Sequence, residues 1–383
     1  MDVRALGLGV IAASMAIAAC GGSTGGTTPS PSASIAPTPT PTPVASPLVV
    51  WAVTTGSSKV IRTLTPAGGV VHTIATIPAA SQILGVGAGK LAYLSSALSL
   101  HIVGLATAAD ASYSTGASPS SDTVFGAAIS PDGTLVAYVV SSPSSGGRLR
   151  ILTVATGASA TIRTYPAGSV DAPVEWTSTR IVATTIVPFS DAGPQAAVGL
   201  DPATGAQVFS TSISGSSGPE YSGDGTHVAN SVHTAGLGDD GDVTAAVGAP
   251  MPFNTLRTFS LGSSPTGVVQ KAHHNINVLA VSQAGTQVLY SNDSSAGGFA
   301  GITLSPDFGL FTFSAGTPRQ LEKLDGPRWD AAAFIDDTTA FAARHMGSNE
   351  ELTVVGGSHA TPSVVDTVAA GDQPVFVGYS PIS

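Results

Sequence analysis

The chain contains 383 residues, of which 45 are Gly, 27 are Pro and only 10 % are charged. So much Gly and Pro argues against a helical bundle. Lys and Arg number 14 against 24 Asp and Glu, and this net charge of −10 argues against a nucleic-acid partner, because phosphate binding needs a basic face. The single cysteine excludes an intramolecular disulfide and any CxxC metal site.

The N-terminus carries the pattern of an export signal. Residues 5–19 form an uncharged apolar run behind Arg4. The run is shorter than the ~20 residues of a membrane-spanning helix, and its length fits a secretory signal peptide. It ends in Ile-Ala-Ala before Cys20, which resembles the lipobox of bacterial lipoproteins. The resemblance implies that residues 1–19 are a cleaved signal peptide and that Cys20 carries lipid. A plain signal peptide is the alternative.

Residues 20–46 are predicted to be a tether. After Cys20 the segment is rich in Gly, Ser and Thr, and then has Pro at every second position from 37 to 43. Such a composition has too little apolar surface to fold. Its Pro-rich half favours an extended polyproline helix of ~3.1 Å per residue.

Residues 47–383 consist of short strand-like runs separated by Gly, Ser, Pro and Asp. Four clear runs are 48–54, 135–140, 149–154 and 181–187, and no long amphipathic helix is evident. Strands this short with turns this frequent are typical of an all-β sandwich, barrel or propeller.

Internal repetition decides among these folds. Residues 122–168 form the clearest unit, with four strand-like runs, the first two joined by a Pro131-Asp132-Gly133 turn that favours a tight hairpin. Partial copies of this hairpin recur every 43 to 60 residues, close to the period of a four-stranded propeller blade. Their anchor positions are Gly87, Ser130, Thr177, Ser222, Ser282, Ile335 and Ser380.

The most complete copy of the hairpin, at residues 130–138, also resembles the repeat of a known family. The run S-P-D-G-T-L-V-A-Y at 130–138 resembles the repeat of TolB-type propellers, in which a W-S-P-D-G-x-x-[IL]-A-[FY] hairpin joins the first two strands of each blade. Trp176, Tyr221, Phe334 and Tyr379 match the aromatic position, while only one repeat keeps the full S-P-D-G. The resemblance implies a propeller over 47–383 and says little about function.

The two ends of the domain predict how the ring closes. Residues 374–381 resemble an inner strand with no partners after it, and residues 48–54 resemble a second strand with no inner strand before it. The C-terminal strand is therefore expected to complete the first blade, which gives seven blades. Because 222–282 is long and irregular, the sequence leaves six or eight blades open.

Catalytic and metal motifs are scarce. Residues 47–383 contain no GxSxG nucleophile elbow, which separates the chain from propeller peptidases of the prolyl oligopeptidase type. We interpret His273-His274 as a polar loop, because adjacent strand residues face opposite sides. The acidic run 239–242 lacks the distal Glu of a calcium loop, and Glu350-Glu351 is expected in an exposed turn. We predict no metal and no cofactor.

One set of polar residues is more regular. Asp122, Asp171, His274, Asp330 and Asp372 each lie five to eight residues before a hairpin anchor. In a propeller this places them where an outer strand crosses to the next inner strand, around one mouth of the central channel. We predict a ligand site there for a cation or a cationic group. Alternatively, these residues only form hydrogen bonds with neighbouring blades.

The sequence thus predicts an exported, lipid-anchored β-propeller that faces the extracytoplasmic side of a cell membrane or outer membrane. We interpret it as a non-enzymatic module that binds a protein or small ligand at one propeller face, with no nucleic acid as partner. The alternative is a lactonase- or hydrolase-like enzyme with a metal or carboxylate site at the channel mouth. A purely structural envelope protein is a third possibility.

Overall fold

The computed structural model describes most of the domain that begins at residue 47. The described residues are 47–67, 69, 71–190, 193–213, 216–233, 253–272, 275–293, 309–323, 328–357, 359–369 and 375–381. The predicted signal peptide, Cys20, the tether, His274 and Asp372 lie outside these ranges, as do the 239–242 run and His273. None of the described residues belongs to a helix long and apolar enough to cross a membrane.

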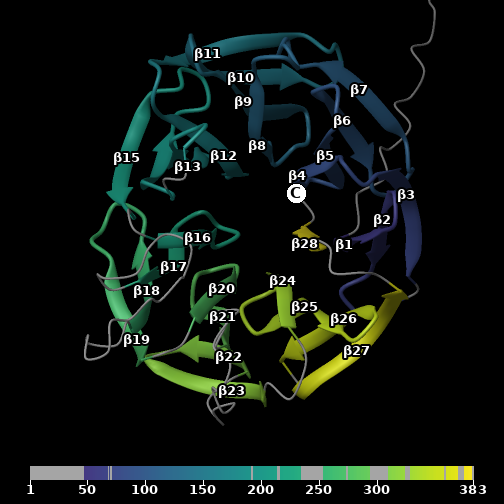
Figure 1. The fold of residues 1–383 in the computed structure, drawn as a ribbon, viewed down its shortest axis with the longest axis vertical. Helices are drawn as coiled ribbons and strands as arrows, with labels where there is room; N and C mark the ends of the chain where they lie inside the picture. The colour runs from purple at the N-terminus through teal and green to yellow at the C-terminus, as the bar shows by residue number, and fades with distance from the viewer. Residues whose placement is uncertain are drawn as a thin grey trace, which may run out of the picture. The chain divides into compact units, whose positions relative to one another are not determined.

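Seven antiparallel four-stranded sheets surround a central channel as the blades of a propeller (Figure 1). The innermost strands are β28 (Val375–Ser380), β4 (Gln82–Gly87), β8 (Thr123–Ile129), β12 (Val170–Trp176), β16 (Ser216–Tyr221), β20 (Asn275–Val281) and β24 (Arg328–Phe334). The second strands are β1 (Leu48–Thr55), β5 (Lys90–Leu94), β9 (Leu135–Ser142), β13 (Ile181–Ile186), β17 (His227–His233), β21 (Gln287–Asp293) and β25 (Thr339–Met346).

The two outer layers complete each blade. The third strands are β2 (Ser58–Leu64), β6 (Ser99–Gly104), β10 (Gly146–Thr153), β14 (Ala196–Leu200), β18 (Phe253–Ser260), β22 (Gly309–Ser314) and β26 (Asn349–Gly356). The outermost strands are β3 (His72–Pro78), β7 (Asp110–Ser114), β11 (Ser159–Tyr165), β15 (Gln207–Ser212), β19 (Thr266–Ala272), β23 (Thr317–Lys323) and β27 (His359–Ala369).

The predicted closure of the ring is confirmed. Strand β28, from the C-terminus, pairs antiparallel with β1 in the first blade, with Trp51 opposite Val377 and Leu48 opposite Ser380. The sheet order β28-β1-β2-β3 therefore joins both ends of the domain, and the blade count is seven rather than six or eight.

The core of the domain lies between blades, because each sheet buries both of its faces against its neighbours. Second strands are accordingly apolar on both sides, as in β9, where all but the first residue is buried. Outermost strands such as β3 are mostly exposed or half-buried. The described residues form seven hydrophobic clusters, one at each blade interface. The cluster between the fourth and fifth blades is the smallest, with four buried residues.

Local turn chemistry explains why the predicted anchors are correct. Each anchor is the last residue of an inner strand or directly follows it. In the third blade, Asp132 accepts hydrogen bonds from the Ser130 hydroxyl (2.6 Å) and the Thr134 backbone N–H (3.0 Å). In the fifth blade, Asp224 accepts the equivalent two hydrogen bonds, from the Ser222 hydroxyl at 2.6 Å and from the Thr226 backbone N–H at 2.9 Å. These carboxylates fix the hairpin that connects inner and second strands.

One local expectation is wrong. Glu350-Glu351 does not form an exposed turn but begins β26. Glu350 is fully buried and lies opposite His345, whose Nδ1 is 2.9 Å from the Glu350 carboxylate. Glu351 accepts a hydrogen bond of 2.9 Å from Arg344. Cross-strand partners on β25 therefore contact both carboxylates, and the sequence positions alone do not reveal them.

Candidate functional site

A cavity of about 560 Å³ occupies one end of the central channel, where the inner strands turn into the second strands. All seven innermost strands contribute to its wall, including Val86 of β4, Ile129 of β8 and Phe334 of β24. Its volume lies in the range of small-molecule sites, about 300–1,000 Å³. The ring geometry of the blades thus creates one shared site at this mouth.

The wall of the cavity is acidic and aromatic. Glu175, Glu220 and Asp224 line it, and no Lys, Arg or His belongs to the described lining. The aromatic lining residues are Trp176, Tyr221, Phe334, Phe376 and Tyr379. This combination favours a ligand that carries positive charge and apolar surface.

Glu175 and Glu220 occupy equivalent positions in the fourth and fifth blades. Each lies two residues before its hairpin anchor, Thr177 or Ser222, and a register shift, a β-bulge, lies next to it in the pairing with the second strand. The other five blades carry only small residues at this position, namely Gly85, Ala128, Ala280, Ala333 and Gly378. Bulges re-aim side chains at sites of this kind.

The seam between these two blades is the most open one at the channel. The inner strands of all other neighbouring blades are in close contact, whereas β12 and β16 have at most marginal contact. A hydrogen bond of 2.7 Å between the Thr184 and Tyr221 hydroxyls bridges this seam. The two glutamates therefore lie on the two inner strands that flank this seam.

The two glutamates are electrostatically unusual. Burial raises the pKa of the Glu175 carboxyl group to about 8, although the backbone N–H of Trp176 lowers it in part. Burial also raises the pKa of Glu220 to about 8. Both residues nevertheless keep partial exposure, because they face the cavity. A cation in the cavity would relieve the cost of ionising them.

Asp224 differs from these two glutamates. Its burial would raise its pKa, but hydrogen bonds from Ser222 and Thr226 hold the pKa below its usual value. Because its oxygens serve the hairpin turn, Asp224 adds negative charge at the rim and has little freedom to coordinate a ligand.

The three described residues of the predicted ring lie at the other ends of the inner strands. Asp171 is the second residue of β12, Asp330 the third residue of β24, and Asp122 immediately precedes β8. None of the three lines the cavity. His274 and Asp372 lie outside the described residues, so the ring as a whole stays a prediction.

The contacts of two of these residues go to the protein itself. Asp122 accepts hydrogen bonds from the Ser118 backbone N–H at 2.8 Å and from the Ser121 hydroxyl at 3.0 Å, and the Ser118 bond is the main reason its pKa is lowered. Asp171 is buried, accepts a 2.7 Å hydrogen bond from Thr185 and lies 3.8 Å from Arg163 of the preceding blade.

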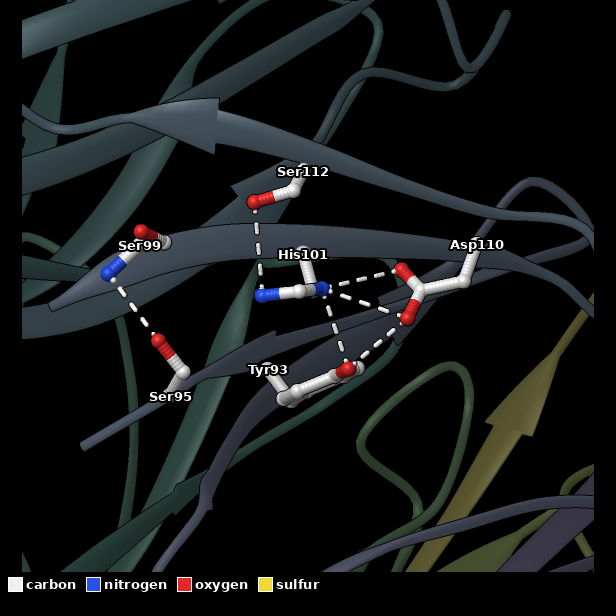
Figure 2. Close-up of polar contacts among 6 residues, drawn as sticks. All are labelled: Tyr93, Ser95, Ser99, His101, Asp110 and Ser112. Atoms are coloured by element: carbon white, nitrogen blue, oxygen red, sulfur yellow. Dashed lines mark hydrogen bonds and ion pairs between the residues drawn. The ribbon is translucent and has the colours of Figure 1, made fainter. Parts of the chain in front are cut away.

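A second polar cluster lies on the second blade, away from the channel cavity (Figure 2). His101 Nδ1 is 3.1 Å from Asp110, and its Nε2 is 3.4 Å from the Ser112 hydroxyl. Tyr93 donates to Asp110 at 2.8 Å and stacks on His101, with ring centroids 4.5 Å apart. The order Ser-His-Asp is that of a catalytic triad. However, Asp110 and Ser112 lie on the exposed strand β7, and none of the three residues lines the channel cavity.

No metal centre is evident in the described part of the chain, where no three His, Cys, Asp or Glu side chains are grouped to hold an ion. Sequence reasoning missed Glu175 and Glu220 as site residues. The available signal was the repeat alignment itself, because an acidic residue replaces a small one at the same position in only these two repeats.

No protein-family model matches the chain, and no curated protein matches it. Solved structures share its fold. The tricorn protease aligns with 82 % of this chain at 10 % identity and a TM-score of 0.50, and the aligned part is 34 % of that protease. The propeller domain of the Trilobed protease from Pyrococcus furiosus has 12 % sequence identity to this chain and a TM-score of 0.48. The alignment covers 85 % of this chain and 86 % of the chain of that domain.

A TolB-type protein from Agrobacterium tumefaciens is also similar. The alignment covers 87 % of this chain and 97 % of the Agrobacterium chain, at 12 % identity and a TM-score of 0.43. Identities this low describe the propeller fold alone.

Proposed function

We propose that this protein is a lipid-anchored cell-envelope propeller that binds a ligand in the channel cavity without transforming it. The observation that carries the proposal is the cavity, which all seven inner strands line and in which two carboxyl groups lack a basic neighbour. Buried carboxyl groups without basic partners are costly to fold around. A binding role gives a reason for placing two of them at one mouth.

The anchoring part of the proposal rests on the sequence. Cys20 follows the apolar run, and the segment to residue 46 has the composition of a solvated tether. Lipid chains on Cys20 would hold the propeller at a membrane surface. Substituting Cys20→Ala should move the protein to the soluble fraction of lysed cells while the propeller keeps its melting temperature. A variant that stays with the membrane would contradict lipid anchoring.

The binding part is tested by filling the cavity. Ala333 lines the cavity and is half-buried, so Ala333→Phe should block it. The matched control is Ala111→Phe on the exposed outermost strand β7. A panel of small amines, alcohols, acids and tripeptides is screened by saturation-transfer NMR. We expect to find compounds that bind the wild type and Ala111→Phe but not Ala333→Phe. If no compound binds, or the blocked variant binds equally, the cavity is not the site.

An enzyme remains the alternative function, and one observation favours it. Two carboxyl groups with pKa raised to about 8 can act as general acids at neutral pH. The discriminating assay incubates the protein with simple lactones and p-nitrophenyl esters. Turnover that Glu175→Gln abolishes would favour the enzyme, and the Ser112→Ala variant would report whether the cluster of Figure 2 contributes instead.

A further inference from the structure

The two glutamates that face the cavity have no basic side chain as a partner. Glu220 has no hydrogen-bond or ion-pair partner among the described residues, and Glu175 receives only the backbone N–H of Trp176. Two arginines of the third and fourth blades are engaged elsewhere. Arg163 donates to the Gly205 carbonyl at 3.0 Å, and Arg180 lies over the Phe209 ring at 5.4 Å. Neither glutamate thus has a basic side chain of the described chain as its partner.

The lining of the cavity favours an organic cation over a bare metal ion as the ligand. Calcium takes six to eight oxygen ligands, whereas the described residues contain no group of even three acidic or imidazole side chains arranged for a metal. The rest of the wall is mostly apolar and includes the aromatic residues Trp176, Phe334 and Phe376. Aromatic rings attract cations and also bury apolar surface.

We propose that the cavity binds a protonated organic amine, whose ammonium group pairs with Glu175 and Glu220 and whose apolar part contacts the aromatic wall. This inference rests on the proposed binding function and specifies its ligand. An ammonium group offers three hydrogen-bond donors, which suits two carboxylates on adjacent blades. The five other blades carry Gly or Ala at the same position, so they leave room for the body of the ligand.

The proposal implies that binding releases protons. Five titratable groups face the cavity from three elements and their adjoining turns, namely Glu175, Glu220, Tyr221, Asp224 and Tyr379. Asp224, with its lowered pKa, is already ionised, and the tyrosines, with raised pKa values, stay neutral. Only the two glutamates, with pKa near 8, change state when a cation arrives. Affinity should therefore rise with pH below about pH 8, by at most about tenfold per pH unit for each glutamate that releases a proton.

The experiment is isothermal titration calorimetry on the full chain with benzylamine, benzyl alcohol, benzoate and calcium chloride. We expect benzylamine to bind at least about tenfold more tightly than benzyl alcohol, and benzoate and calcium not to bind. Affinity should increase from about pH 6 to about pH 8, with proton release detected by comparing buffers of different ionisation enthalpy. Glu175→Gln and Glu220→Gln should each lose about tenfold or more, whereas Asp110→Asn, outside the cavity, should not change it.

The outcomes separate this inference from the proposed function. If benzyl alcohol binds as tightly as benzylamine and Ala333→Phe abolishes both, the cavity is a binding site but the amine inference is overturned. Calcium binding that depends on Glu175 and Glu220 would overturn it in favour of a metal site. If neither these compounds nor the wider panel binds, both the inference and the binding function fail.

Discussion

Trp51 and Asp366 lie 315 positions apart in the chain, yet the indole N–H of Trp51 donates a hydrogen bond of 3.1 Å to the Asp366 carboxylate. Arg62 donates to the same carboxylate at 2.7 Å. Trp51 and Arg62 belong to the first blade and Asp366 to the last. The ring is therefore closed by side chains between blades as well as by the backbone pairing of β28 with β1.

The first prediction concerns this side-chain closure. Asp366→Ala removes the acceptor of both a tryptophan and a partly buried arginine, whose side chain is 25 % exposed. Leaving such donors unsatisfied costs about 1–3 kcal/mol, which lowers the melting temperature by about 1–4 °C in a domain of this size. Differential scanning calorimetry measures the change. The control is Asp201→Ala, a half-buried turn residue whose carboxylate contacts only its own turn. Equal shifts in the two variants would contradict a special role for Asp366.

The second prediction concerns the backbone closure. Deleting residues 372–383 removes β28 and leaves the first blade without its innermost strand. The loss exposes the inner edge of β1 and opens the channel wall, so the whole domain should melt more than about 10 °C lower or fail to fold. Deleting only residues 382–383 is the control and should have no effect. A 372–383 deletion that melts within a couple of degrees of the full chain would refute the closure argument.

The fold was predictable because its signals are local and repeated. The Ser130-Asp132-Thr134 turn is determined by neighbouring side chains, and the same chemistry recurs at Ser222 and Asp224. Alignment of these hairpins therefore placed every inner strand and the closing strand.

The candidate site was less predictable, because side-chain direction depends on bulges and neighbouring blades. Asp171 has the right sequence position for a channel mouth, yet it contacts Thr185 on β13 and Arg163 on the preceding blade. Glu175, four residues later and next to a bulge, lines the cavity near the opposite end of β12. The repeat spacing singled out the start of the inner strands, whereas the cavity lies where these strands end.

The third prediction concerns packing between the third and fourth blades. Gly126 and Gly56 have the same φ of +58°, so replacing either glycine with alanine introduces a similar backbone strain. A Cβ at Gly126 would collide with the carbonyl oxygen of Pro173 on β12, whereas one at Gly56 meets nothing within 4 Å. Gly126→Ala should therefore destabilise the domain by about 2 kcal/mol or more beyond Gly56→Ala. Chemical denaturation compares the two variants, and equal losses would show that the blades can shift to make room.

The fourth prediction concerns the pH dependence of stability in the ligand-free protein. Glu175 and Glu220 have pKa values raised from 4.5 to about 8 in the folded state. Between these two values the folded protein holds protons that the unfolded chain has released. The free energy of unfolding must then fall as the pH rises from about 4.5 to about 8, and be independent of these groups outside that window.

Replacing both glutamates with glutamine removes this dependence. Glu175→Gln/Glu220→Gln should gain stability relative to the wild type at about pH 8, on the order of a few kcal/mol, because the neutral amide avoids the cost of ionisation. Near pH 4.5 the two proteins should differ little, since the wild-type carboxyl groups are then protonated when folded. Urea unfolding at several pH values provides the measurement, with Asp110→Asn as the control outside the channel. A double variant that keeps the wild-type slope between pH 5 and 8 would show that the cavity leaves both carboxyl groups ionised and well hydrated.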